Sequence, residues 1–87
     1  MKKTKQNTYE KIVVIDWVDS KGVTGSWEYL DEIDEMKPSL CISVGYLLND
    51  KKQYKEICQS INKSSPDKQV IGRMVIPTCS IKKIKKL

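Results

Sequence analysis

The C-terminal residues 69–87 read QVIGRMVIPTCSIKKIKKL. An apolar strand leads to Pro77, which has no N–H donor and a fixed φ, so the strand must end or turn a corner there. Three small residues follow, and the chain is then expected to return to the core through Ile81, Ile84 and Leu87. The stretch therefore predicts a strand, a one-turn helical corner and a short last strand.

Such a corner closes SH3-like and Sm-like barrels, in which the last strand pairs with the first. We therefore predict a mainly β fold with one short helix, a small SH3-like or Sm-like barrel of about five strands. A chain of 87 residues suits one such domain over 1–87, small enough to be only marginally stable unless subunits associate. A homo-oligomer is expected on this ground.

The N-terminal part predicts the first strand. Residues 1–8 are polar and Lys-rich and are expected to form a flexible basic arm. In the run from Lys11 to Asp19, alternation places Val13, Ile15 and Trp17 on one face and Ile12, Val14, Asp16 and Val18 on the other. Both faces are largely apolar, so the second face should be buried or covered by an arm, a helix or a neighbouring subunit.

A loop with two glycines follows, and Ser26 is then a plausible N-cap for a short helix over residues 27–36. Apolar residues recur every three positions at Trp27, Leu30, Ile33 and Met36, with acidic residues opposite. Pro38 ends this element, because the residue before a proline disfavours helical geometry. The sequence therefore predicts one amphipathic helix, with Trp27 buried.

The middle of the chain predicts two more strands. In residues 39–49 the larger side chains of Leu40, Ile42, Val44, Tyr46 and Leu48 alternate with Cys41, Ser43 and Gly45. Residues 53–61 are interpreted as a third strand, although the spacing of their apolar residues also fits a helix over residues 50–60. Residues 62–68 form a polar loop before the closing strand.

Composition narrows the function. No apolar run reaches the roughly 20 residues that span a bilayer, and no signal-peptide core is present, so we expect a cytoplasmic protein without a membrane partner. The sequence has no histidine, which removes the commonest general base and metal ligand. Its three cysteines are widely spaced and predict buried thiols rather than disulfides or a zinc site.

The net charge of +5 is distributed unevenly. Lysines crowd both ends of the chain, at positions 2, 3, 5 and 11 and at positions 82, 83, 85 and 86, while five acidic residues fall within positions 28–35. Since the first and last strands of the predicted fold are neighbours, the lysines are expected to form one face that attracts polyanions or to be a solvated surface.

One resemblance extends over nearly the whole chain. It rests on Val13-x-Ile15-x-Trp17-x-Asp19-Ser20, Trp27, Ser43-Val44-Gly45-Tyr46-Leu47 and Gly72-Arg73-Met74-Val75-Ile76-Pro77-x-Cys79-x-Ile81. With this pattern the chain resembles a group of small hypothetical proteins encoded by bacteriophages and prophages, which has no established activity. The resemblance implies a small β-rich fold in the cytoplasm of an infected bacterium.

Catalysis is not expected. Asp16, Asp19 and Glu28 could be considered as a carboxylate cluster, but Asp16 and Asp19 point to opposite faces of a regular strand and cannot share one ion. We therefore predict no enzyme, no metal and no cofactor. The candidate ligand-binding residues combine an aromatic ring with phosphate donors: Tyr46, Arg73, Lys82 and Lys83. Gly45 would let a ligand or another backbone approach beside Tyr46.

Three functions fit these residues. The favoured one is non-enzymatic capture of a small anionic, nucleotide-derived ligand, such as an immune signal that a phage benefits from removing. The second is nucleic-acid binding through the same lysines, with affinity that falls steeply with salt. The third is an adaptor or inhibitor that binds a host protein through the acidic residues Asp31, Glu32 and Glu35 or through an exposed strand edge.

Overall fold

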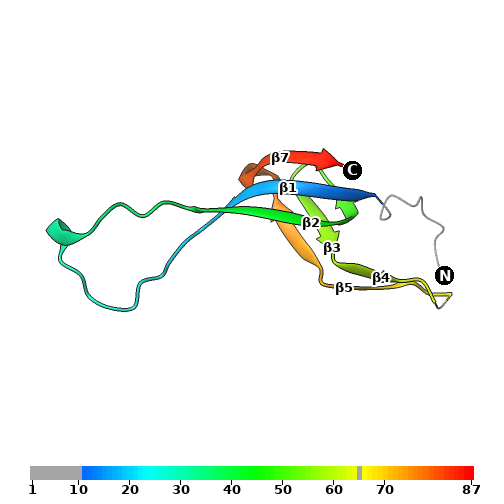
Figure 1. Ribbon diagram of the computed structural model, residues 1–87, viewed down its shortest axis with the longest axis horizontal. Helices are drawn as coiled ribbons and strands as arrows, with labels where there is room; N and C mark the ends of the chain where they lie inside the picture. Colours follow the sequence, from blue (N-terminus) through cyan, green and yellow to red (C-terminus); the bar gives the residue numbers. More distant parts are fainter. Residues whose placement is uncertain (1–10, 65) are drawn as a thin grey trace.

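The computed structural model describes residues 11–64 and 66–87. The predicted basic arm over residues 1–8 lies outside the described residues. The fold is mainly β and contains two antiparallel sheets (Figure 1). The larger sheet has the strand order β6-β3-β2-β1-β7, built from β1 (Ile12–Asp19), β2 (Ser39–Asp50), β3 (Tyr54–Cys58), β6 (Met74–Pro77) and β7 (Ile81–Lys86). The smaller sheet pairs β4 (Ser60–Asn62) with β5 (Gln69–Ile71).

The C-terminal corner confirms the prediction made from Pro77. Strand β6 ends at Pro77, the short 3-10 turn η3 (Thr78–Ser80) follows, and β7 pairs antiparallel with β1. Strands β6 and β7 thus occupy opposite edges of one sheet although only three residues separate them, so the sheet must curve. Among the described residues the two edge strands are not hydrogen-bonded to each other, and the sheet is not closed into a barrel.

The strand predicted over residues 53–61 is confirmed in preference to a helix over residues 50–60, but it is broken. Strand β3 gives way to β4 at Gln59, opposite the break between β5 and β6 at Gly72. The Gln59 N–H donates to the carbonyls of Ile71 (3.0 Å) and Gly72 (3.1 Å), and Gly72 has a φ of +74°. A Cβ on Gly72 would lie 2.7 Å from the Cβ of Gln59, so glycine permits this bend of the long hairpin.

The core is small. Its buried cluster consists of Val13, Ile15, Leu47, Ile57 and Ile76, with Trp17 and Ile81 packed against it. The expected inner face of the first strand is confirmed. Ile84 and Leu87 are exposed, which corrects the prediction that they return to the core; β7 is an edge strand, and Leu87 follows its last paired residue.

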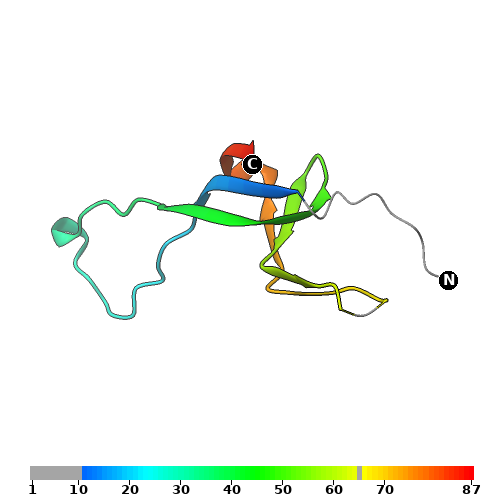
Figure 2. The same ribbon diagram turned by 45° about the vertical axis from the view of Figure 1, so that its right-hand side comes forward.

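The predicted helix over residues 27–36 is wrong. Residues 20–38, here called the acidic loop, contain only the 3-10 turn η2 (Leu30–Glu32), and every residue of the loop is exposed. Trp27, expected in the core, is fully exposed. A helix of about ten residues is marginal in water without a surface to pack on, and the loop projects away from the sheet in both ribbon views (Figures 1 and 2).

Candidate functional site

A groove lies between β1, the start of β2 and the start of β7. Its volume is about 490 Å³, within the range of roughly 300–1,000 Å³ typical of small-molecule sites. Seven residues from the three strands line it: Asp16, Trp17, Leu40, Cys41, Ile42, Lys82 and Lys83. The groove thus combines an apolar wall with cationic groups.

An irregularity in strand pairing places the two lysines. Asp16 pairs with Lys83 and Trp17 pairs with Ile81, which leaves Lys82 as the extra residue of a β-bulge. Bulges change the direction of side chains on the bulged strand. Two consecutive lysines, which would point to opposite faces of a regular strand, therefore both reach the groove.

The ring of Trp17 is held on the core side of the sheet by polar and apolar contacts. Its Nε1 donates a hydrogen bond to Oγ of Ser43 at 3.0 Å, across the β1–β2 pair. The same ring packs against the buried core and is itself only partly buried. The alternation along β1 places Asp16 on the opposite face, so the ring of Trp17 fixes the strand that carries Asp16 to the groove.

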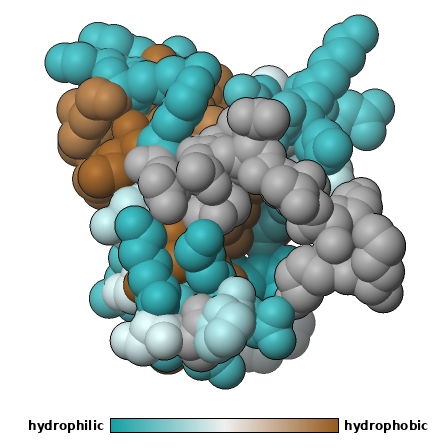
Figure 3. Space-filling view, turned by 90° about the vertical axis from the view of Figure 1, so that its right-hand side faces the viewer, coloured by the Kyte–Doolittle hydropathy of each residue, from teal (hydrophilic) through white to brown (hydrophobic). Residues whose placement is uncertain are grey.

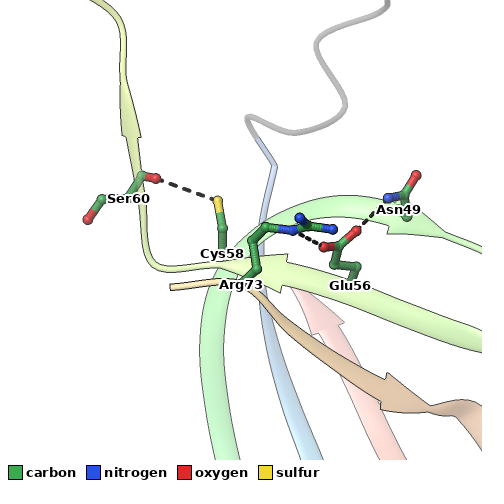
Figure 4. Close-up of polar contacts among 5 residues, drawn as sticks. All are labelled: Asn49, Glu56, Cys58, Ser60 and Arg73. Atoms are coloured by element: carbon green, nitrogen blue, oxygen red, sulfur yellow. Dashed lines mark hydrogen bonds and ion pairs between the residues drawn. The ribbon is translucent and has the colours of Figure 1, made fainter. Parts of the chain in front are cut away.

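Arg73, predicted as a phosphate donor, is engaged in an internal ion pair. Its Nε donates to Oε2 of Glu56, and Nδ2 of Asn49 donates to Oε1 of the same carboxylate at 2.6 Å (Figure 4). The Glu56 side chain is only 5% exposed, whereas that of Arg73 is 64% exposed. The hydrogen bond from Arg73, followed by that from Asn49, holds the pKa of Glu56 below its ordinary value of 4.5.

Tyr46 lies at the opposite end of β1 from the groove. It pairs with Ile12 and with Cys58, four residues along β1 from Asp16, which at about 3.3 Å per residue is roughly 13 Å. Gly45 admits another backbone here, because a Cβ on it would lie 2.7 Å from the carbonyl oxygen of Cys58. The structure therefore brings Lys82 and Lys83 together and leaves Tyr46 and Arg73 elsewhere.

The acidic residues predicted to bind a partner lie in the acidic loop. Asp31 and Glu32 fall within η2, and Glu35 follows it; all three are exposed. The sequence predicts that the three residues lie on one α-helix. The structure has only a 3-10 turn there, so they do not share a helix face. Their only shared feature is a position on a loop that projects from the sheet (Figure 1).

Five groove residues were not among the predicted ligand contacts: Asp16, Trp17, Leu40, Cys41 and Ile42. One signal was available for Asp16, since a carboxylate among large apolar residues needs a polar partner, and here it pairs in register with Lys83. The residues from β2 could not be found without the β1–β2 register, because nothing in their chemistry marks them as ligands.

The cysteines differ in their surroundings. All three are free, and the buried-thiol prediction is confirmed for Cys58, whereas Cys41 is partly buried and Cys79 is exposed at the η3 corner. Burial, and then the nearby Glu56 carboxylate, raises the pKa of the Cys58 thiol above its ordinary value. Its Sγ lies 3.7 Å from the carbonyl oxygen of Ser60. These features describe a structural thiol rather than a reactive one.

Lysines continue along the sheet beyond the groove. Lys11 and Lys86, from the predicted basic clusters, line a second depression of about 370 Å³ together with Lys51 and four residues of β2, Leu47, Leu48, Asn49 and Asp50. Oδ1 of Asp50 accepts a hydrogen bond from Nζ of Lys55 at 2.6 Å, and this bond lowers the pKa of Asp50. The two ends of the chain thus contribute lysines to one region, as the strand pairing predicted.

Within residues 11–64 and 66–87, no set of three or more carboxylate, thiol or imidazole groups is placed to hold a metal ion. No helix in the same ranges is long and apolar enough to cross a bilayer.

Comparison with known proteins gives no assignment. No protein-family model matches the chain, and no curated protein or solved structure shows significant similarity to it.

Proposed function

We propose that this chain is a non-enzymatic binding protein that captures a small anionic, nucleotide-derived ligand in the groove beside β7. One observation carries the proposal: a β-bulge places Lys82 and Lys83 at a groove of ligand size whose wall includes the exposed side chains of Leu40 and Ile42. Lysine ammonium groups bind phosphate as point charges, and an apolar wall suits the face of a base.

The groove chemistry also favours selectivity for a nucleotide over a bare anion. Asp16 adds one carboxylate beside Lys83, which would accept hydrogen bonds from ribose hydroxyls or from amino groups of a base. Leu40 and Ile42 add apolar surface that inorganic phosphate cannot use. The ligand class is therefore one that joins a charged phosphate to a flat, partly apolar base.

The C-terminal corner at η3 supports a finer assignment of the fold, and the resemblance of the sequence supports a biological setting. The strand order and the 3-10 turn between opposite edge strands support an SH3-like barrel in which further closure joins β6 to β7. With a phage origin, implied by the resemblance of the sequence, the captured ligand would be a nucleotide signal of host immunity. The protein would act in the cytoplasm of the infected cell by stoichiometric binding.

A second candidate is nucleic-acid binding, and one observation favours it. The lysines of β7, at positions 82, 83, 85 and 86, are all exposed along an edge strand, and lysines from other elements extend the row at the second depression. Backbone phosphates could bind along such a row without base readout. Binding of this kind weakens steeply with salt, whereas a groove that also holds a base depends less on it.

The test is calorimetric titration of the full chain with a nucleotide panel that includes mononucleotides and cyclic dinucleotides, in moderate salt. The double substitution Lys82→Ala/Lys83→Ala is expected to weaken binding by at least about tenfold, since hydrogen bonds to charged groups contribute roughly 1.5–3 kcal/mol each. The matched control is Lys51→Ala/Lys52→Ala in the β2–β3 turn, which removes the same charge and should bind normally. Equal weakening in both variants would show general charge attraction instead of this site.

A further inference from the structure

Two apolar surfaces have no partner among residues 11–64 and 66–87. The first is the acidic loop, whose large apolar side chains are all exposed: Val23, Trp27, Tyr29, Leu30, Ile33 and Met36. A loop that stays in water normally carries polar and turn-forming residues, not six large apolar ones. The loop therefore has the composition of a segment that packs against something.

The second surface is the outer face of the β1–β2 pair, here defined by Val14, Val18, Leu40, Ile42 and Val44. The pairing of β1 with β2 places these side chains beside one another, with Val14 opposite Val44 and Val18 opposite Leu40. Leu40 is 76% and Ile42 71% exposed, because the core lies on the other face of the pair, beneath Val13 and Ile15. Monomeric proteins rarely leave a sheet face of this kind uncovered.

The two surfaces have complementary charge. The acidic loop contains five carboxylates and two lysines, a net charge of −3. The remaining described residues contain eleven cations and five carboxylates, a net charge of +6. The outer face also carries the carboxylate of Asp16, opposite Ile42, and lysines border it directly, since Lys83 pairs with Asp16 and Lys85 with Val14. An acidic and apolar segment is therefore suited to an apolar face edged by lysines.

The geometry directs the loop to another molecule. Strands β1 and β2 stay paired up to Asp19 and Ser39, so the loop leaves along the strand direction, away from its own sheet (Figures 1 and 2). The radius of gyration is 17.8 Å, whereas a compact domain of this length has about 12 Å. The molecule measures 60 × 24 × 21 Å, and much of its length is this projection.

The exposed area is sufficient for a stable contact. Trp27 and Tyr29 alone can bury about 150–250 Å² each, and the other apolar side chains of the loop add to this. In a symmetric dimer each copy buries both its own acidic loop and its own outer face. The area buried per copy then approaches the roughly 800 Å² per partner found in stable complexes. Seen from the end opposite the loop, apolar side chains gather on one side of the molecule, bordered by hydrophilic ones (Figure 3).

We propose that the acidic loop of one copy lies on the outer face of the β1–β2 pair of a second copy, so that the chain is a homo-oligomer held by exchanged loops. Leu40 and Ile42 belong both to the outer face and to the groove, so the docked loop borders the groove of the neighbouring copy. The oligomer itself requires no ligand, and its test is independent of the proposed nucleotide binding.

The test uses two full-length variants and measures mass by size-exclusion chromatography with light scattering, without nucleotide. The loop variant is Trp27→Ser/Leu30→Ser, and the face variant is Leu40→Thr/Ile42→Thr, which places a β-branched residue suited to a strand at both positions. All four side chains are exposed, so the core is unchanged. The control, Ile71→Thr in β5, removes an equally exposed apolar side chain outside both surfaces and should match the unmodified chain.

The unmodified chain is expected to be a dimer or larger, and each variant should raise its dissociation constant by at least about tenfold. Mixing the two variants should restore a heterodimer, because the intact loop of the face variant meets the intact face of the loop variant. A monomeric unmodified chain would overturn the proposal and leave the loop to fold back or to bind a foreign protein. A loop variant that stays oligomeric, or a mixture that stays monomeric, would also overturn it.

Discussion

Glu56 shows how one buried carboxylate connects two strands. It lies on β3, is nearly inaccessible to solvent, and accepts hydrogen bonds from Arg73 beside β6 and from Asn49 on β2 (Figure 4). A buried charge is tolerated only when it is paired and hydrogen-bonded, and here both oxygens are satisfied. Arg73 is therefore more important to the sheet than the sequence suggests.

The substitution Glu56→Gln should destabilise the fold near pH 7 by about 1–3 kcal/mol, since the amide has one acceptor oxygen for two donors. The folded pKa of Glu56 is lowered, so its stabilisation is fully present above its ordinary pKa of 4.5 and is lost as pH falls through the folded value. The difference in unfolding free energy between the variant and the unmodified chain should therefore shrink below pH 4.5. Urea denaturation at several pH values checks this, with Glu28→Gln in the exposed loop as control.

Gly45 makes a second prediction at the residue scale. The substitution Gly45→Ala would place a Cβ 2.7 Å from the Cys58 carbonyl oxygen and 3.1 Å from the Cβ of Ile57, which forces β2 and β3 apart. We expect a loss of roughly 1–3 kcal/mol in unfolding free energy, typical of overpacking. Gly25→Ala is the matched control, because no heavy atom lies within 4 Å of its built Cβ. Equal denaturation midpoints for the two variants would contradict the close approach of the strands.

At the scale of elements, the acidic loop depends most on its surroundings. If it docks on another copy, trypsin should cleave slowly after Lys21 in the unmodified chain and markedly faster in the face variant Leu40→Thr/Ile42→Thr. The other lysine of the loop, Lys37, precedes Pro38 and is not a trypsin site. The substitution does not touch the loop, so faster cleavage can come only from lost docking. Mass spectrometry of timed digests measures cleavage after Lys21. Cleavage that is equally fast in both proteins would mean that the loop is free.

The loop also shows why one element escaped prediction. The three-residue spacing from Trp27 to Met36 is a genuine helical pattern, but a pattern shows only that one side is apolar and does not supply a surface to bury it. Within the described part of the chain no surface packs against that side, and a single turn at Leu30–Glu32 remains. Strands β1 and β2 were predictable because each finds its hydrogen-bonding partner within the chain.

At the scale of the whole molecule, local chemistry predicted the corner at Pro77 and the pairing of the last strand with the first. The candidate site was predictable in part. Lys82 and Lys83 stood out by charge, but a bulge brings them to one groove, and a bulge has no signal in this sequence. The register of β1 and β2 separates Tyr46 from that groove and adds Leu40 and Ile42 to it. Register depends on pairing across the sheet, which residue patterns alone do not specify.

The central claim is that the groove beside β7 captures a small anionic ligand. Native mass spectrometry of the unmodified chain, alone and with a panel of cyclic nucleotides, cyclic oligonucleotides and ADP-ribose derivatives, tests it most directly, with short single-stranded DNA as comparator. We predict an oligomer that retains one small ligand per groove at moderate salt, and loss of that ligand in Lys82→Ala/Lys83→Ala. A chain that binds none of the small ligands, or holds only the DNA and releases it as salt rises, would contradict the claim.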